Sequence, residues 1–115
     1  MAKILPALNR SAVLVTPRQP FVDWLRSVDT SSADLEVEDV CAPTIYLLAG
    51  AEDDEVLERL VCEASRRIFE DQLEGWYRVR SRWPITRDFE TFCLWFDYRA
   101  EALLLDLCED PLAHD

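Results

Sequence analysis

Residues 11–25 read Ser11-Ala-Val-Leu-Val-Thr16-Pro-Arg-Gln-Pro20-Phe-Val-Asp-Trp-Leu25. The first six residues are a β-branched apolar run that Pro17 ends, which predicts a buried strand over 11–16. Thr16 is then a suitable N-cap for a helix with Pro17 in its first turn. The apolar residues at 21, 24, 25 and 28 follow the spacing of an amphipathic helix. The chain therefore begins with a strand followed by a helix.

A second strand is predicted at Thr44-Ile-Tyr-Leu-Leu-Ala49, between Pro43 and Gly50. Its continuous apolar character is typical of a strand that is covered on both faces. Because a helix connects the two strands, we expect a right-handed crossover that leaves them parallel. Residues 30–42 between them are interpreted as an acidic connector, with a frayed edge strand as the alternative.

Two further helices are predicted. The longer spans residues 52–74: acidic residues crowd its first turn, where the helix dipole favours them, and Gly75 is placed as its C′ residue. Four consecutive carboxylates at residues 52–55 could also suggest a divalent metal site, but the helix dipole is sufficient to explain them. The shorter helix is capped by Thr86 or Asp88, and one face carries the apolar residues Phe89, Phe92, Cys93 and Phe96.

Residues 98–107 fit a helix or a strand. We favour the strand, because two strands alone make a poor sheet. The prediction is an α/β fold (α+β-like): a small three-stranded sheet, element order β-α-β-α-α-β, with helices packed against the sheet. Residues 1–10 are expected to form a flexible N-terminal arm, residues 11–110 a single domain and residues 111–115 a tail.

The composition excludes several kinds of catalytic site. Gly50 and Gly75 are the only glycines, so no glycine-rich phosphate loop or nucleophile elbow can be written. Lys3 is the only lysine and His114 the only histidine, and both lie near the ends of the sequence. We therefore expect no Schiff-base lysine and no nucleophile–histidine pair. The sequence predicts no catalytic residue and no cofactor.

The four cysteines, Cys41, Cys62, Cys93 and Cys108, form no C-x-x-C pair. We expect buried structural thiols in a reducing cytosol and no metal site. Cys62 is the candidate for partial exposure, because it lies near the edge of the long helix's apolar face. The apolar stretches are too short for a signal peptide or a membrane span, so we expect a cytoplasmic protein that contacts no membrane.

Charge is distributed unevenly along the chain. The net charge of −11 disfavours nucleic acid as a partner. Residues 64–87 nevertheless hold six of the twelve basic residues. Arginine binds carboxylate or phosphate bidentately, and tryptophan and arginine dominate interaction hot spots. The candidate binding residues are therefore Arg78, Arg80, Arg82, Trp83 and Arg87. In the alternative, Trp76 and Trp83 fill the core while the arginines neutralise an acidic neighbour such as residues 88–115.

Trp95 is the sixth candidate. On a helix numbered from Phe89 it lies off the apolar face, so we expect it to be exposed and to border a binding surface with Arg82 and Trp83. Trp95→Ala should then cost little stability. The alternative is that the N-terminal arm or the acidic connector covers it.

Three segments support a family resemblance. The segment Trp83-Pro84 … Arg87-Asp88-Phe89-Glu90-Thr91-Phe92 … Trp95-Phe96-Asp97 resembles a signature of a family of short, acidic bacterial proteins with no assigned function. Thr16-Pro17 … Pro20-Phe21 … Trp24-Leu25 and Pro43-Thr44-Ile45-Tyr46-Leu47-Leu48 are similar to earlier segments of that family. The resemblance covers residues 11–110. The resemblance implies a strand in the final segment, which is usually rich in β-forming residues in that family. Ala100-Glu101-Ala102 departs from this composition. The resemblance implies no function.

The leading hypothesis is a non-enzymatic interaction module that binds a protein partner or forms a homo-oligomer. The alternative is a small enzyme, or a metabolite- or anion-binding protein, that uses the arginine-rich loop. The two differ in whether the guanidinium groups converge on a pocket.

Overall fold

The computed structural model describes residues 5–114. Within them lie three strands, β1 (Arg10–Pro17), β2 (Thr44–Ala49) and β3 (Phe96–Glu101), and three longer helices, α1 (Gln19–Val28), α3 (Asp54–Trp76) and α4 (Phe89–Trp95). The predicted three-stranded sheet and the order β-α-β-α-α-β are confirmed. The connector adds a one-turn helix, α2 (Val37–Val40), and 3₁₀ turns occupy Thr30–Asp34 and Arg80–Arg82.

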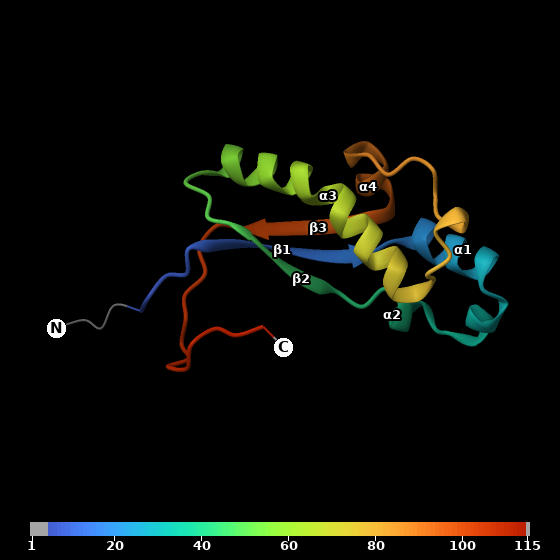
Figure 1. Cartoon of the computed structure of the whole chain (residues 1–115), viewed down its shortest axis with the longest axis horizontal. Helices are drawn as coiled ribbons and strands as arrows, with labels where there is room; N and C mark the ends of the chain where they lie inside the picture. Colours follow the sequence, from blue (N-terminus) through green and yellow to red (C-terminus); the bar gives the residue numbers. More distant parts are fainter. Residues whose placement is uncertain (1–4, 115) are drawn as a thin grey trace.

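All strand pairs in the sheet are antiparallel. The order is β2-β1-β3, and Val13 of the central strand lies opposite Tyr46 on one side and Ala100 on the other. The predicted parallel crossover is therefore wrong. Figure 1 shows the physical reason: α1 and α2 lie beyond the end of β1, so the chain turns back there and β2 starts beside the end of β1.

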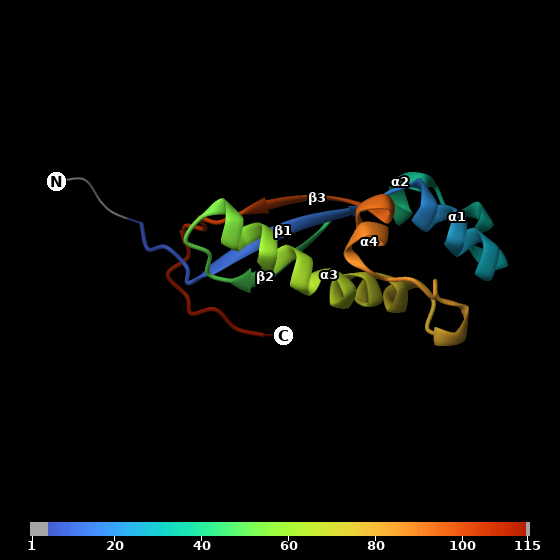
Figure 2. The same ribbon diagram turned by 90° about the horizontal axis from the view of Figure 1, so that it is seen from above.

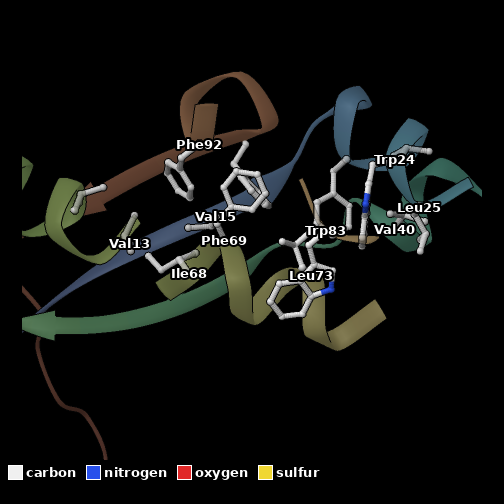
Figure 3. Packing of buried hydrophobic residues seen from close by; sticks show 14 residues of the cluster. Val13, Val15, Trp24, Leu25, Val40, Ile68, Phe69, Leu73, Trp83 and Phe92 are labelled. Carbon is white, nitrogen blue, oxygen red and sulfur yellow. The ribbon is translucent and has the colours of Figure 1, made fainter. Parts of the chain in front are cut away.

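The core lies between one face of the sheet and the helices. Val13 and Val15 are fully buried under α3, whose Ile68 and Phe69 point at the sheet (Figure 3). Phe92 of α4 joins them. Figure 2 shows α3 running along one side of the sheet. Helices α3 and α4 thus lie on one face of the sheet, and none of the described helices covers the opposite face.

Caps explain where α3 and α4 begin. The carboxylates of Asp53 and Asp88 accept hydrogen bonds of 2.9 Å from the backbone N–H groups of Val56 and Thr91, respectively. At the other end, α3 continues to Trp76, so Gly75 is a helical residue rather than the predicted C′ residue.

Two element boundaries differ from the predicted ones. Strand β1 continues through Pro17, so Thr16 is not the N-cap and α1 begins at Gln19 with Pro20 in its first turn. Strand β3 begins at Phe96 rather than at residue 98 and ends at Glu101. Beyond it, Ala7 and Leu105 form an isolated antiparallel bridge.

Residues of the two end segments pair with each other. The N–H of Leu8 donates to the carbonyl of Leu104, and the N–H of Asp106 donates to the carbonyl of Pro6, at 2.8 and 2.9 Å. Residues 1–4 of the predicted arm and residue 115 of the predicted tail lie outside the described residues. Among residues 5–114, no helix is both long and apolar enough to span a bilayer.

Candidate functional site

The arginine-rich segment joins α3 to α4 at one end of the molecule (Figure 1). Two indoles hold it in place. Trp83 is 6% exposed, and its Nε1 donates a hydrogen bond of 2.7 Å to the carbonyl of Tyr77. Trp24 of α1 donates from its Nε1 to the carbonyl of Arg82 at 2.9 Å. Trp83 is therefore part of the core and anchors the loop.

Arg80 and Arg87 both contact the Trp83 ring. Their guanidinium carbons lie 5.0 and 5.8 Å from its centroid, within cation–π range. Arg87 also donates to the carbonyl of Pro84 at 2.6 Å, and its Nε lies 3.8 Å from the carboxylate of Glu70 on α3. The acidic neighbour of Arg87 is therefore on α3, not in residues 88–115. These contacts give Arg87 a structural role in holding the loop on α3.

Arg78, Arg80 and Arg82 are exposed. Within residues 5–114, none of the three forms an ion pair with an acidic group. The structure thus brings Arg80, Trp83 and Arg87 together, whereas Arg78 and Arg82 take no part in that cluster. The two cavities described below lie elsewhere and hold none of these side chains.

The expectation that Trp95 is exposed is wrong. Trp95 is partly buried, and its ring centroid lies 5.3 Å from that of Phe69, 6.1 Å from Phe21 and 6.3 Å from Trp24. The helical projection fails because α4 ends at this residue, and Phe96 is already in strand geometry. Trp95 therefore packs against α1 and α3, and neither the arm nor the connector is needed to cover it.

The sheet has an apolar face without a helical cover, here called the open face: Ala12, Leu14, Ile45 and Leu47. Leu14 lies opposite Ile45, and Ala12 lies opposite Leu47. The side chains of Leu14, Ile45 and Leu47 are 37%, 66% and 54% exposed. The prediction that residues 44–49 are covered on both faces is therefore wrong. In an antiparallel sheet one face commonly remains in water, but the continuous apolar run of residues 44–49 gave no sign of this.

A cavity of about 340 Å³ lies on the open face, lined by Ala12, Leu14, Ile45, Arg99, Glu101 and Leu104. The Nε of Arg99 lies 2.8 Å from the carboxylate of Glu101, so the β3 side carries an ion pair. In the segment after β3, Leu103, Leu105 and Leu107 are 69%, 50% and 80% exposed.

A second cavity, of about 380 Å³, lies between β2 and α3, lined by Tyr46, Leu47, Leu48, Ala64, Arg67, Ile68 and Asp71. The Tyr46 hydroxyl donates to the Asp71 carboxylate at 2.5 Å and accepts from Gln72 Nε2 at 2.7 Å. Burial, followed by the hydrogen bond to Asp71, raises the pKa of Tyr46 above its ordinary value. Tyr46 is therefore neutral at physiological pH.

The four cysteine thiols are free, and the prediction of buried structural thiols, with Cys62 as the candidate for partial exposure, is wrong. Cys62 and Cys108 are exposed, whereas Cys41 and Cys93 are partly buried. Burial is the main cause that raises the pKa values of Cys41 and Cys93. Cys62 is thus more exposed than the partial exposure expected for it.

Comparison of the chain with protein-family models, curated proteins and solved structures finds no match. The resemblance to a bacterial family therefore stays a prediction.

Proposed function

We propose that the chain is a non-enzymatic, cytoplasmic protein-interaction module that binds a protein partner through the open face of its sheet. The exposure of Leu14, Ile45 and Leu47 on neighbouring strands carries this proposal. Burial of apolar surface contributes about 25 cal/mol per Å². A partner that covers these three side chains gains this free energy, which the isolated domain leaves unused.

Charge indicates the chemistry of the partner. The chain as a whole is acidic, with a net charge of −11, although Asp97 and Glu101 on the β3 side of the open face pair with Arg18 and Arg99. A partner with an apolar centre and basic residues at its margin complements this arrangement. Because opposite charges attract at the margin, raising the salt concentration should weaken this association.

The arginine loop supports a second candidate, the binding of a carboxylate or phosphate group. Arg78, Arg80 and Arg82 are exposed without acidic partners in the described chain. Neither of the two cavities reported above is lined by a guanidinium group of this loop, so the form that we propose for this candidate is a flat protein contact. This candidate would be favoured if an Arg78→Glu/Arg82→Glu variant no longer bound an acidic ligand that a variant altered on the open face still bound.

The test of the open face uses the Leu14→Thr/Ile45→Thr variant, because both residues line the open-face cavity and neither lines the cavity between β2 and α3. Threonine keeps a good strand propensity while it removes apolar surface. Ile85→Thr is the matched control, because Ile85 is 94% exposed and lies outside the sheet. Wild type and both variants are used as baits at low salt in an extract of the source cells, and each captured protein is purified and its Kd measured.

The expected result is a partner that wild type and Ile85→Thr bind equally and that the double variant binds about tenfold or more weakly. NMR shift changes on binding should map to Leu14, Ile45 and Leu47. Equal binding by all three chains, or shift changes confined to the arginine loop, would contradict the proposal.

A further inference from the structure

Strand β2 is an unprotected edge of the sheet. Its outer side pairs with no other strand among residues 5–114, and Figure 1 shows it along one border of the sheet. Its sequence, Thr-Ile-Tyr-Leu-Leu-Ala, holds no charged residue, although charged residues make up 30% of the chain. Edge strands in monomers usually carry charges, prolines or bulges that prevent pairing. Pro43 precedes β2, but nothing within the strand blocks its outer edge.

The cavity between β2 and α3 reaches this edge. Tyr46 and Leu48 point to the helix side of the sheet, and Leu47 points to the open face, yet all three line the cavity. Consecutive residues of β2 line it together, so the cavity borders this strand, whose outer side pairs with no strand among residues 5–114. It therefore lies where the side chains of an added neighbouring strand would enter.

We infer that β2 pairs antiparallel with β2 of a second copy of the chain, so that two three-stranded sheets become one sheet of six strands. Every second residue of β2 directs its N–H and C=O groups away from β1, and the partner strand satisfies them. The side chains of the partner's β2 on the helix side fill the cavity of about 380 Å³. The two α3 helices then run antiparallel on either side of the two-fold axis.

Charges beside the edge are self-complementary. Arg67 and Asp71 line the cavity and lie one helical turn apart on α3. Across a two-fold axis between antiparallel helices, Arg67 of each copy faces Asp71 of the other, and both pairs form together. This patch and the uncharged strand sum to zero charge, so two copies can meet here without the local repulsion expected elsewhere on a chain of net charge −11.

The same features select a second copy over an unrelated peptide. The added strand must carry no charge, and its flanks must offer an acid opposite Arg67 and a base opposite Asp71. The β2–α3 unit itself meets all these requirements. The inference goes beyond the proposed function, because it rests on the strand edge and on a different cavity.

Charge reversal at the axis provides the test. Arg67→Glu places two acidic pairs across the axis, and Asp71→Arg places two basic pairs there. An equimolar mixture of the two variants restores both opposite-charge pairs in a heterodimer. Arg59→Glu is the control, since it changes the net charge as much as Arg67→Glu does but lies outside the cavity lining. Sedimentation equilibrium gives the mass of each sample over a range of concentrations.

Wild type and Arg59→Glu should reach twice 13.3 kDa as concentration rises. The dimer Kd of Arg67→Glu should be about tenfold higher or more, and the mixture should recover the wild-type value. Hydrogen exchange adds a direct readout, because dimerisation should protect all amides of β2 rather than alternate ones. If Asp71→Arg does not fold, two measurements still test the dimer. They are the difference in dimer Kd between Arg67→Glu and Arg59→Glu, and the hydrogen exchange of the β2 amides.

A mass of 13.3 kDa at every concentration would overturn the inference. So would a dimer that Arg67→Glu leaves intact, or one in which alternate β2 amides still exchange rapidly. The proposed function is tested separately: a monomer that binds a partner through the open face overturns only the dimer, whereas a dimer whose partner binds Leu14→Thr/Ile45→Thr as tightly as wild type overturns only the proposed function.

Discussion

The indole Nε1 of Trp24 donates a hydrogen bond of 2.9 Å to the carbonyl oxygen of Arg82, fifty-eight residues later in the chain. This single bond joins α1 to the loop that follows α3. Because Trp24 is buried and also contacts Tyr77 and Trp95, its ring and its N–H group tie together three segments distant in sequence.

Trp24→Phe should therefore loosen the arginine loop. The substitution keeps an aromatic ring but removes the donor, which should lower the free energy of unfolding by about 1 kcal/mol or more. Urea denaturation measures this change, and faster hydrogen exchange in residues 80–83 should accompany it. An unchanged exchange rate there would show that the bond does not hold the loop.

The aromatic contacts of Trp95 predict that its truncation destabilises the fold, whereas the helical projection predicts little loss of stability. Trp95→Ala should lower the free energy of unfolding by about 2–4 kcal/mol, close to the roughly 3–5 kcal/mol expected for Phe92→Ala. Leu94→Ala is the control, because Leu94 is 62% exposed and should change stability by less than about 0.5 kcal/mol. A cost for Trp95→Ala as small as that of Leu94→Ala would restore its interpretation as a surface anchor.

The cysteines should react with iodoacetamide in two groups. Cys62 and Cys108 are exposed and should be alkylated first in the native protein. Cys41 and Cys93 should react later, because burial restricts access and raises their pKa values, which lowers the thiolate fraction. Peptide mass spectrometry over time gives the four rates. Equal rates for Cys93 and Cys62 would contradict the structure.

Stability should fall at high pH because of Tyr46 and Tyr98. Burial, with the Asp71 and Glu58 carboxylates respectively, raises both pKa values in the folded state. Because the hydroxyls lose their protons less readily in the folded state, their protonated forms contribute to the free energy of unfolding. This contribution is complete below the ordinary tyrosine pKa of about 10 and is lost progressively as pH rises above it. Thermal unfolding between pH 8 and 12 measures the decline. Tyr46→Phe/Tyr98→Phe should flatten it.

The local elements were predictable because their signals lie within short windows. The β-branched run that contains Val13 and Val15 and the helical spacing of Phe21, Trp24 and Leu25 each need only a few neighbouring residues. The direction of β2 was not, because it depends on α1 packing beyond the end of β1. No pattern inside residues 44–49 separates a parallel partner from an antiparallel one.

The candidate site was predictable only in part. A cluster of arginines and tryptophans is visible in the sequence, but the position of Arg87 depends on Glu70 and on the buried ring of Trp83. Trp95 was misplaced because a helical projection assumes that the helix continues past it. The open face depends on which side of the sheet α3 and α4 pack, which no pattern within the sequence of β2 determines.

The pairing of residues 6–8 with 104–106 has a mechanical consequence. Both end segments leave the sheet at the same end, and they run antiparallel (Figure 1). Tension applied between them therefore loads the Ala7–Leu105 bridge first and then peels β3 from β1 one pair at a time, because successive backbone hydrogen bonds lie in series with the force. A pull from the ends should unzip this protein at low force, starting from the strands that hold its core.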